Sequence, residues 1–105
     1  MKNLLSKLKK FRDKRDWKKF HTPENLAKSI VIEAAELLEN YQWDNSLVDL
    51  ENVKEEVADI FAYLLLLCDA ENIDLYGELE KKIKKNNEKY PVDKAYGIAK
   101  KYTDL

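Results

Sequence analysis

The fold is decided by the stretch Ser29-Ile-Val-Ile-Glu33-Ala-Ala-Glu36-Leu-Leu-Glu39 and by its counterpart, Glu55-Glu56-Val-Ala-Asp59-Ile-Phe-Ala-Tyr63. In both stretches apolar residues recur every three or four positions, which predicts helices with one buried face. Each helix also carries two acids three positions apart, so each pair shares a helix face. The pairs are Glu33 with Glu36 and Glu56 with Asp59. Two neighbouring helices of this kind would bring four carboxylates together.

The flanking sequence predicts further helices. Thr22 can cap a helix that begins with Pro23. Pro91 ends another, because the residue before a proline avoids helical geometry. Residues 44–46 (Asp-Asn-Ser) predict a turn. We therefore expect helices over residues 4–17, 22–41, 47–70 and 75–90, and a further short helix within 92–105. The short connections between them predict an all-α, antiparallel four-helix bundle.

The composition fits one helical domain. The chain has 105 residues, 37% of them charged, with only two Gly and two Pro, which favours helices and a single domain over residues 1–105. The net charge of −1 indicates no bias toward a nucleic acid polymer. Cys68 is the only cysteine, so we expect a buried thiol and a reducing compartment. Neither a signal peptide nor a membrane-length apolar run is apparent, which predicts a soluble, cytoplasmic protein without membrane contact.

The four carboxylates need positive partners. Asp59 is the only charged residue in the apolar run 57–68, and burying an unpaired carboxylate is costly. Lys54 is the only base between Glu33 and Asp59, so a divalent metal ion would serve all four acids. Oxygen ligands favour Mg²⁺, with Mn²⁺ as a substitute. A di-iron site would need Glu-x-x-His pairs, and the one histidine, His21, lies outside both motifs.

The same acids allow other interpretations. Acids three positions apart are also common on solvated helix faces, and Glu55, four positions before Asp59, competes with Glu56 as a ligand. The stretch up to residue 19 and the region 81–101 are basic, whereas the centre is acidic. A charge run often marks only a solvated face. This distribution nevertheless also suits a ligand that combines a metal with several phosphates.

The acid pattern resembles that of the MazG-like nucleoside triphosphate pyrophosphohydrolases: Glu33-x-x-Glu36, nineteen residues, then Glu56-x-x-Asp59. Further segments resemble the dCTP-pyrophosphatase branch of this superfamily. They are Arg15-Asp16-Trp17-Lys-Lys-Phe20-His21-Thr-Pro-Glu-Asn25-Leu26, Glu36-Leu-Leu-Glu-Asn-Tyr-Gln42-Trp43, Tyr63, and Lys82-Ile-Lys-Lys-Asn86-Asn-Glu-Lys89-Tyr90-Pro91-Val92. One position departs from the branch: Leu8 stands where the animal dCTP enzymes carry a histidine that faces the base. The resemblance therefore leaves the base preference open.

The resemblance implies a homodimeric or homotetrameric bundle in which Glu33, Glu36, Glu56 and Asp59 hold Mg²⁺. It implies hydrolysis of a nucleoside triphosphate, dCTP or a similar one, to a monophosphate and pyrophosphate, as in housecleaning of the nucleotide pool. Glu36 or the nearby Glu39 would take the proton of the attacking water. Aromatic residues would hold the base and sugar, and lysines with an asparagine would hold the phosphates. These residues are Trp17, His21, Trp43, Tyr63, Lys82, Lys85, Asn86, Lys89 and Tyr90.

The alternative function is a non-catalytic helical module, such as a dimerising adaptor whose acids bind a metal or a basic partner. The enzyme is favoured because the carboxylate motif comes with aromatic and lysine companions. An adaptor has no need for Trp43 beside a turn, or for an acid such as Asp59 inside an apolar run.

Overall fold

The chain is entirely helical in the computed structural model, which describes residues 2–43 and 48–105. The elements are α1 (Lys2–Lys14), the 3₁₀ turn η1 (Lys18–Phe20), α2 (Pro23–Glu39), α3 (Leu50–Ala70), α4 (Leu75–Lys89), α5 (Val92–Ala95) and the 3₁₀ turn η3 (Tyr102–Asp104). No strand occurs in these described ranges, so the predicted all-α class is confirmed. The chain forms two compact units, Met1–Ile73 and Asp74–Leu105. One domain over 1–105, and a bundle that includes α4, stay predictions.

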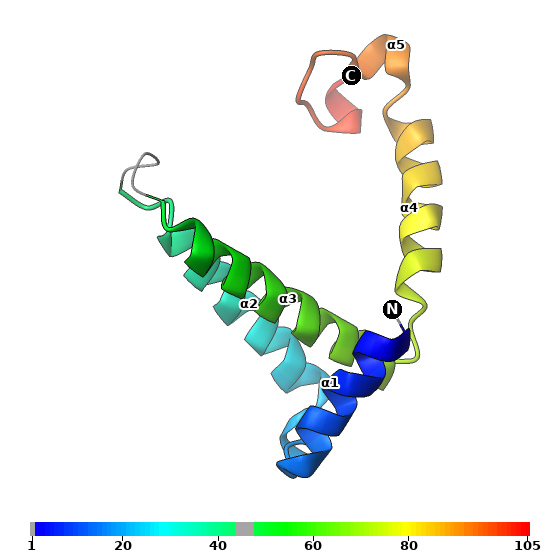
Figure 1. Ribbon diagram of the computed structural model, residues 1–105. Coiled ribbons are helices and arrows are strands. Elements are labelled where there is room, and N and C mark those ends of the chain that lie inside the picture. The colour runs from blue at the N-terminus through cyan, green and yellow to red at the C-terminus, as the bar shows by residue number, and fades with distance from the viewer. Residues whose placement is uncertain (1, 44–47) are drawn as a thin grey trace. The chain divides into compact units, whose positions relative to one another are not determined.

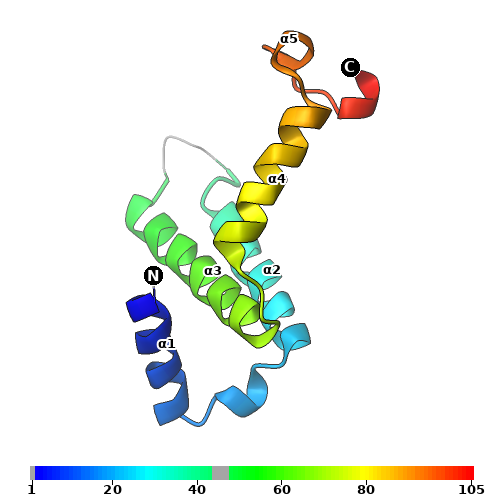
Figure 2. The same cartoon turned by 90° about the vertical axis from the view of Figure 1, so that its right-hand side faces the viewer.

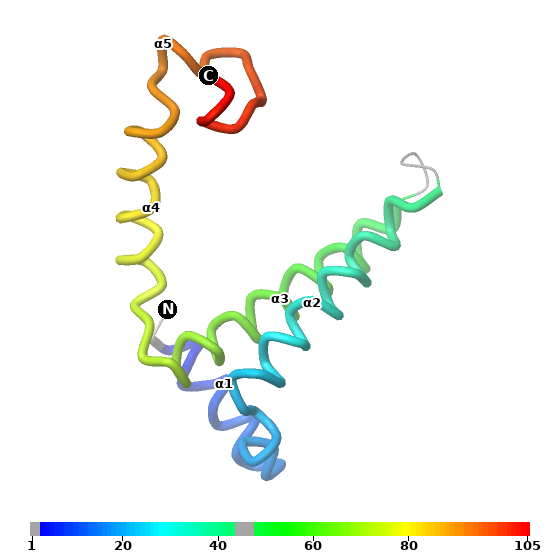
Figure 3. The backbone as a smooth tube through the Cα atoms, turned by 180° about the vertical axis from the view of Figure 1, so that it is seen from behind, coloured from blue at the N-terminus to red at the C-terminus, as the bar shows by residue number. Residues whose placement is uncertain are grey.

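The first unit is built on α2 and α3, which lie side by side and run in opposite directions (Figures 1 and 3). Helix α1 packs against α3 (Figure 2), and an ion pair of 3.3 Å between Lys9 Nζ and Asp69 Oδ2 joins the two. The buried apolar residues are Leu26 of α2 with Leu66 and Cys68 of α3. The predicted buried thiol is therefore confirmed.

Side-chain caps fix the ends of α2 and α3. The Asn25 N–H donates to Thr22 Oγ1 at 3.2 Å, so α2 begins where the sequence predicts. The Asn52 N–H donates to Asp49 Oδ1 at 3.2 Å and starts α3. The Asn52 side chain also donates to Asn40 Oδ1 at 3.0 Å, which ties the two helices together. The turn predicted over residues 44–46 lies outside the described residues.

The end of α1 differs from the prediction. The helix stops at Lys14 rather than near Trp17, because Asp16 adopts a left-handed conformation with φ of 56°. The N–H of Trp17 then donates to the carbonyl of Arg12 at 3.1 Å. This turn folds the indole of Trp17 back onto Phe11, with ring centroids 5.8 Å apart. The chain reversal is therefore what positions Trp17.

The second unit consists of α4, α5 and η3. Asp74 caps α4 by accepting from the Gly77 N–H at 3.2 Å. Helix α4 ends at Lys89, just before Pro91, and α5 follows, as the sequence predicts. The rings of Tyr90 and Tyr102 meet edge to face, 6.1 Å between centroids. Among the described residues of both units, no helix combines the length and apolarity needed to cross a bilayer.

Candidate metal centre and adjoining cavity

Three of the four predicted ligands come together across the antiparallel pair. Glu33 of α2 and Glu56 and Asp59 of α3 each offer an oxygen atom, and these oxygens lie within 4.8 Å of one another. We call these three residues the carboxylate cluster. Glu33 and Glu56 are half-buried, whereas Asp59, expected in an apolar interior, is exposed. Glu55 is also exposed and lies outside the cluster, so the geometry favours Glu56 over Glu55.

Glu36 borders the cluster without belonging to it. Its side chain is exposed, yet its carboxyl group is close enough to Glu33 to raise the pKa of that residue. Glu39, one turn further along α2, is exposed. Glu36 is therefore the acid beside the cluster, and its part as a fourth ligand stays a prediction.

The carboxylate cluster fits a hard cation. Glu33 Oε2 and Glu56 Oε2 are buried without a hydrogen-bond partner, and a buried oxygen without a donor is costly. Within residues 2–43 and 48–105, no ion pair reaches Glu33, Glu56 or Asp59. A divalent ion bound by carboxylate oxygens would satisfy both unpartnered atoms and neutralise the shared charge.

Crowding of the acids perturbs their protonation. Desolvation, the adjacent carboxyl groups of Glu56 and Glu36, and the charge of Asp59 raise the pKa of Glu33 from 4.5 to about 7. The contact with Glu33 lowers the pKa of Glu56, but desolvation and the nearby charges of Glu36 and Asp59 outweigh it and raise that pKa overall. Without metal, the cluster therefore retains a proton between pH 4.5 and about 7, where an isolated glutamate would have released it.

The raised pKa predicts how pH affects the metal-free protein. Between pH 4.5 and about 7 the folded chain keeps the Glu33 proton that the unfolded chain has lost, so this group's contribution to stability falls as pH rises and is constant above that window. A metal requires the ionised form. We expect the melting temperature in EDTA to fall across this window, and the stabilisation by added Mg²⁺ to be larger at pH 8 than at pH 5.5.

Differential scanning fluorimetry of wild type and Glu33→Gln, each with EDTA and with Mg²⁺, measures this effect. The melting temperature of the variant in EDTA should not show the fall across this pH window, and added Mg²⁺ should not raise it. A metal-free wild-type protein whose melting temperature rises relative to Glu33→Gln across the same window would contradict the prediction.

A cavity of about 280 Å³ adjoins the cluster, between α1, α3 and the two residues that flank η1. Among the predicted substrate residues, Trp17, His21 and Tyr63 line it, and Asp59 belongs both to the cavity wall and to the carboxylate cluster. The remaining lining residues are Leu8, Phe11, Arg12, Ala62 and Leu66. The structure thus places the aromatic residues beside the acids. The sequence did not single out Phe11 or Arg12 as site residues.

His21 and Tyr63, two of the polar residues that line the cavity, are neutral at neutral pH. Burial, and then the charge of Arg12, lower the pKa of His21, while burial and the charges of the cluster raise the pKa of Tyr63. The Asn25 side chain donates to the Phe20 carbonyl at 3.0 Å and holds η1 against the start of α2. His21 and Tyr63 face each other edge on, with centroids 6.5 Å apart. The Nδ1 atom of His21 is buried without a hydrogen-bond partner.

Other predicted substrate residues lie outside the cavity. Trp43 is 89% exposed, so core packing does not account for it. Lys82, Lys85 and Asn86 are exposed on α4, and Lys89 Nζ lies 4.7 Å from the centroid of the Tyr102 ring. Tyr90 is half-buried at the end of α4. The contacts of these residues with a substrate stay predictions.

The fold and the cluster define an all-α protein that can hold a metal ion across two antiparallel helices. The family model of the MazG-like family matches residues 28–105, and the chain belongs to this family. It is 35% identical to dCTP pyrophosphatase 1 of Rattus norvegicus, over 90% of this chain and 61% of the relative. It is 33% identical to the Homo sapiens protein of that name, with the same shares covered. The chain therefore spans less than two thirds of these relatives.

The structure is similar to a solved one. The crystal structure of a pyrophosphatase from Archaeoglobus fulgidus DSM 4304 superposes with a TM-score of 0.83 at 45% sequence identity, over 87% of this chain and 92% of that one. The resemblance of the sequence to the MazG-like superfamily and its dCTP-pyrophosphatase branch is thereby confirmed.

Proposed function

We propose that this chain is a Mg²⁺-dependent nucleoside triphosphate pyrophosphohydrolase that converts a (d)NTP into a monophosphate and pyrophosphate. The observation that carries the proposal is the double position of Asp59, which belongs to the carboxylate cluster and also lines the aromatic cavity. A ligand with a flat apolar end and an anionic end fits this juxtaposition. The names of the relatives, dCTP pyrophosphatase 1 and a pyrophosphatase, support the same reaction.

The spacing along α3 suits one nucleotide. Asp59, Tyr63 and Leu66 follow one another at about one turn each. The seven residues from Asp59 to Leu66 span roughly 10 Å of helix axis. The base and sugar would occupy the cavity, with the phosphates at Asp59 and Glu56. Trp17 would then offer a flat face for stacking.

Different residues would bind the metal, accept the proton of the attacking water and bind the leaving pyrophosphate. Glu33, Glu56 and Asp59 would hold Mg²⁺, with Glu36 as a fourth ligand or neighbour, and Mn²⁺ as a substitute. When bound, the ion supplies neutralisation of phosphate charge and orientation of the water that attacks the α-phosphorus. Glu36, which borders Glu33, would accept the proton of that water, in preference to the more distant Glu39. Lys82, Lys85, Asn86 and Lys89 would bind the leaving pyrophosphate.

The test is an incubation of the protein with Mg²⁺ and a panel of deoxynucleoside and nucleoside triphosphates, with products separated by ion-exchange chromatography. We expect equal amounts of monophosphate and pyrophosphate, and no reaction in EDTA. Release of inorganic phosphate would make the proposed reaction wrong. A folded protein that turns over none of the common nucleotides would favour the non-catalytic adaptor.

We further propose a homodimer or homotetramer in the cytoplasm, where the substrates are found. Large apolar side chains on both helices of the central pair are exposed, among them Val31 at 68%, Leu38 at 67% and Leu50 at 61%. Isolated exposed apolar residues are ordinary, but a helix pair with several of them indicates a covered surface. Light scattering after gel filtration should give at least twice the monomer mass of 12.4 kDa, and a mass of one chain would contradict the proposal.

A further inference from the structure

Two aromatic side chains of the cavity wall are not held by burial alone. Phe11 and Trp17 both line the cavity, yet Phe11 is 46% exposed and Trp17 is 43% exposed. Their rings meet edge to face, with centroids 5.8 Å apart. We call these two residues the aromatic pair. Side chains that are nearly half exposed change rotamer readily, so a fixed orientation of the aromatic pair requires a further contact.

Arg15 contacts the aromatic pair without lining the cavity. Its guanidinium carbon lies 3.7 Å from the centroid of the Phe11 ring and 5.9 Å from that of the Trp17 ring. Its Nη1 also donates to the Phe11 carbonyl oxygen at 3.0 Å, in the last turn of α1. Arg15 is exposed and belongs to an open surface pocket that shares Phe11 with the cavity. One side chain therefore contacts both rings and the backbone that carries one of them.

The surroundings of Arg15 favour these aromatic contacts. In the part of the chain that the structure describes, no ion pair involves Arg15. The other residues of its surface pocket are Phe11 and three lysines, namely Lys7, Lys10 and Lys14. A planar guanidinium is weakly hydrated and stacks on aromatic rings, and the face of a ring attracts a cation. Phe11 is therefore the attractive partner that this surface pocket offers to the guanidinium.

We propose that Arg15 is a positioning residue for the nucleotide: it holds the aromatic pair so that the indole of Trp17 is already oriented to stack on the base. This inference rests on the proposed function. Arg15 itself does not touch the nucleotide. Immobilising a side chain on binding lowers affinity, so an indole that is held beforehand loses less freedom when the base stacks on it. Arg15 therefore acts on KM, whereas kcat depends on the carboxylate cluster and stays unchanged.

The first experiment is a double-mutant cycle that measures kcat and KM for dCTP with Mg²⁺. It compares wild type, Arg15→Met, Trp17→Ala and the double variant, each checked for folding by circular dichroism. Methionine keeps an unbranched apolar stem but removes the charge and the donors. We expect Arg15→Met to raise KM by about twofold to fivefold, which corresponds to the loss of one exposed cation–π contact. In the Trp17→Ala background the same substitution should leave KM unchanged, because Arg15 acts through that indole.

The second experiment observes the indole directly and needs no substrate. Trp17 and Trp43 are the two tryptophans of the chain, so Trp43→Phe leaves Trp17 as the only one. Time-resolved fluorescence anisotropy then reports the motion of this ring within the folded protein. Arg15→Met should enlarge the fast, local component of the anisotropy decay. Arg15→Lys keeps the charge but loses the planar fork, so its decay and its KM should lie between those of Arg15→Met and wild type.

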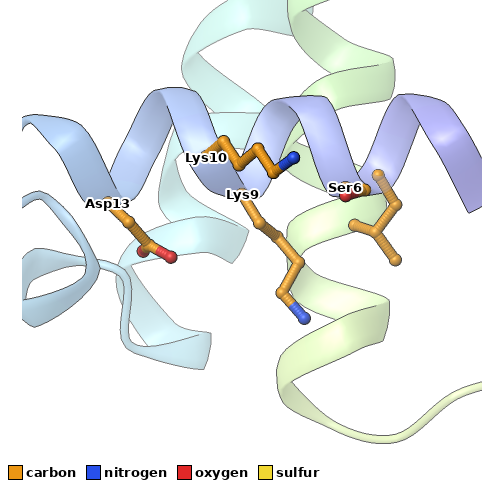
Figure 4. A pocket seen from close by; sticks show the side chains of 5 residues that line it. Ser6, Lys9, Lys10 and Asp13 are labelled. Carbon is orange, nitrogen blue, oxygen red and sulfur yellow. The ribbon is translucent and has the colours of Figure 1, made fainter.

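Lys10→Met is the matched control, since it removes a cation from the same surface pocket. Lys10 also lines a second surface pocket of α1 (Figure 4), and among the described residues it makes no cation–π contact. This variant should keep the wild-type KM and anisotropy decay.

The two experiments can each overturn the role of Arg15. A folded Arg15→Met protein with the wild-type KM would do so, and so would an equal rise in KM with and without the Trp17 indole. An anisotropy decay that is the same in Arg15→Met and in its parent would also overturn it, whatever the enzymatic activity. A wild type that hydrolyses no nucleotide instead refutes the proposed function. Because the anisotropy comparison does not depend on turnover, the two failures are distinguishable.

Discussion

Replacing Glu56 by Gln, or Asp59 by Asn, will abolish Mg²⁺-dependent hydrolysis while the helices remain folded. Both residues offer oxygens to the carboxylate cluster, and an amide is a far weaker ligand for a hard cation than a carboxylate. Loss of a residue that merely orients a ligand typically costs ten- to a hundredfold. Loss of a ligand itself should therefore lower kcat/KM by more than about a hundredfold.

Steady-state kinetics and circular dichroism measure the two parts of this prediction. Glu55→Gln is the matched control, because Glu55 is the exposed acid next to Glu56 and lies outside the cluster. It should keep near wild-type rates. The metal-free Glu56→Gln protein should be at least as stable as wild type, since the repulsion among Glu33, Glu56 and Asp59 is reduced. Near-normal turnover in either cluster variant would refute the metal site.

Replacing Trp17 by Ala will raise the KM for the nucleotide by about fivefold to 150-fold, the range that corresponds to the loss of one base–aromatic stack. The indole of Trp17 lines the cavity and is held by its edge contact with Phe11. The variant leaves the carboxylate cluster unchanged, so kcat should change much less than KM. Trp17→Phe, which keeps a flat ring, should recover part of the affinity.

The control is Phe20→Ala, since Phe20 belongs to the adjoining turn η1 and is 58% exposed. Its removal should leave KM within about twofold of wild type, because surface substitutions have small effects. Equal KM values for Trp17→Ala and wild type, with both proteins folded by circular dichroism, would show that Trp17 only packs against Phe11.

Local sequence rules located the helices because their ends carry explicit signals. Thr22 and Asp74 cap helices with side-chain oxygens, and Pro91 follows the end of α4. The end of α1 was missed because the helical pattern continues to Trp17, while the stop depends on a left-handed Asp16 that the sequence does not disclose. Aspartate tolerates this conformation better than most residues but does not require it.

The faces of the helices were harder to predict. Val31, Leu38 and Leu50 share the apolar pattern with Leu26, yet only Leu26 is buried. A helix that is apolar over more than one face gives no sequence signal for which face meets its neighbour in the same chain. This also explains why Asp59, in the middle of an apolar run, turned out to be exposed.

The acids of the site followed from spacing, and the aromatic residues followed from the family resemblance. Neither route indicated Arg12, because an arginine within a basic helix is usually a solvated residue. A signal was available: Arg12 follows Leu8 by four positions and Leu5 by seven, and so shares a face of α1 with these apolar residues. Its burial became apparent only when α3 was placed against that face.

The double membership of Asp59 means that a nucleoside and a cation would share one wall. Binding of two linked ligands is reciprocal: if the cation raises the affinity for the nucleoside by some factor, the nucleoside raises the affinity for the cation by the same factor. A nucleotide whose base fits the cavity poorly would then also bind the ion less tightly, although hydrolysis of that nucleotide requires the ion.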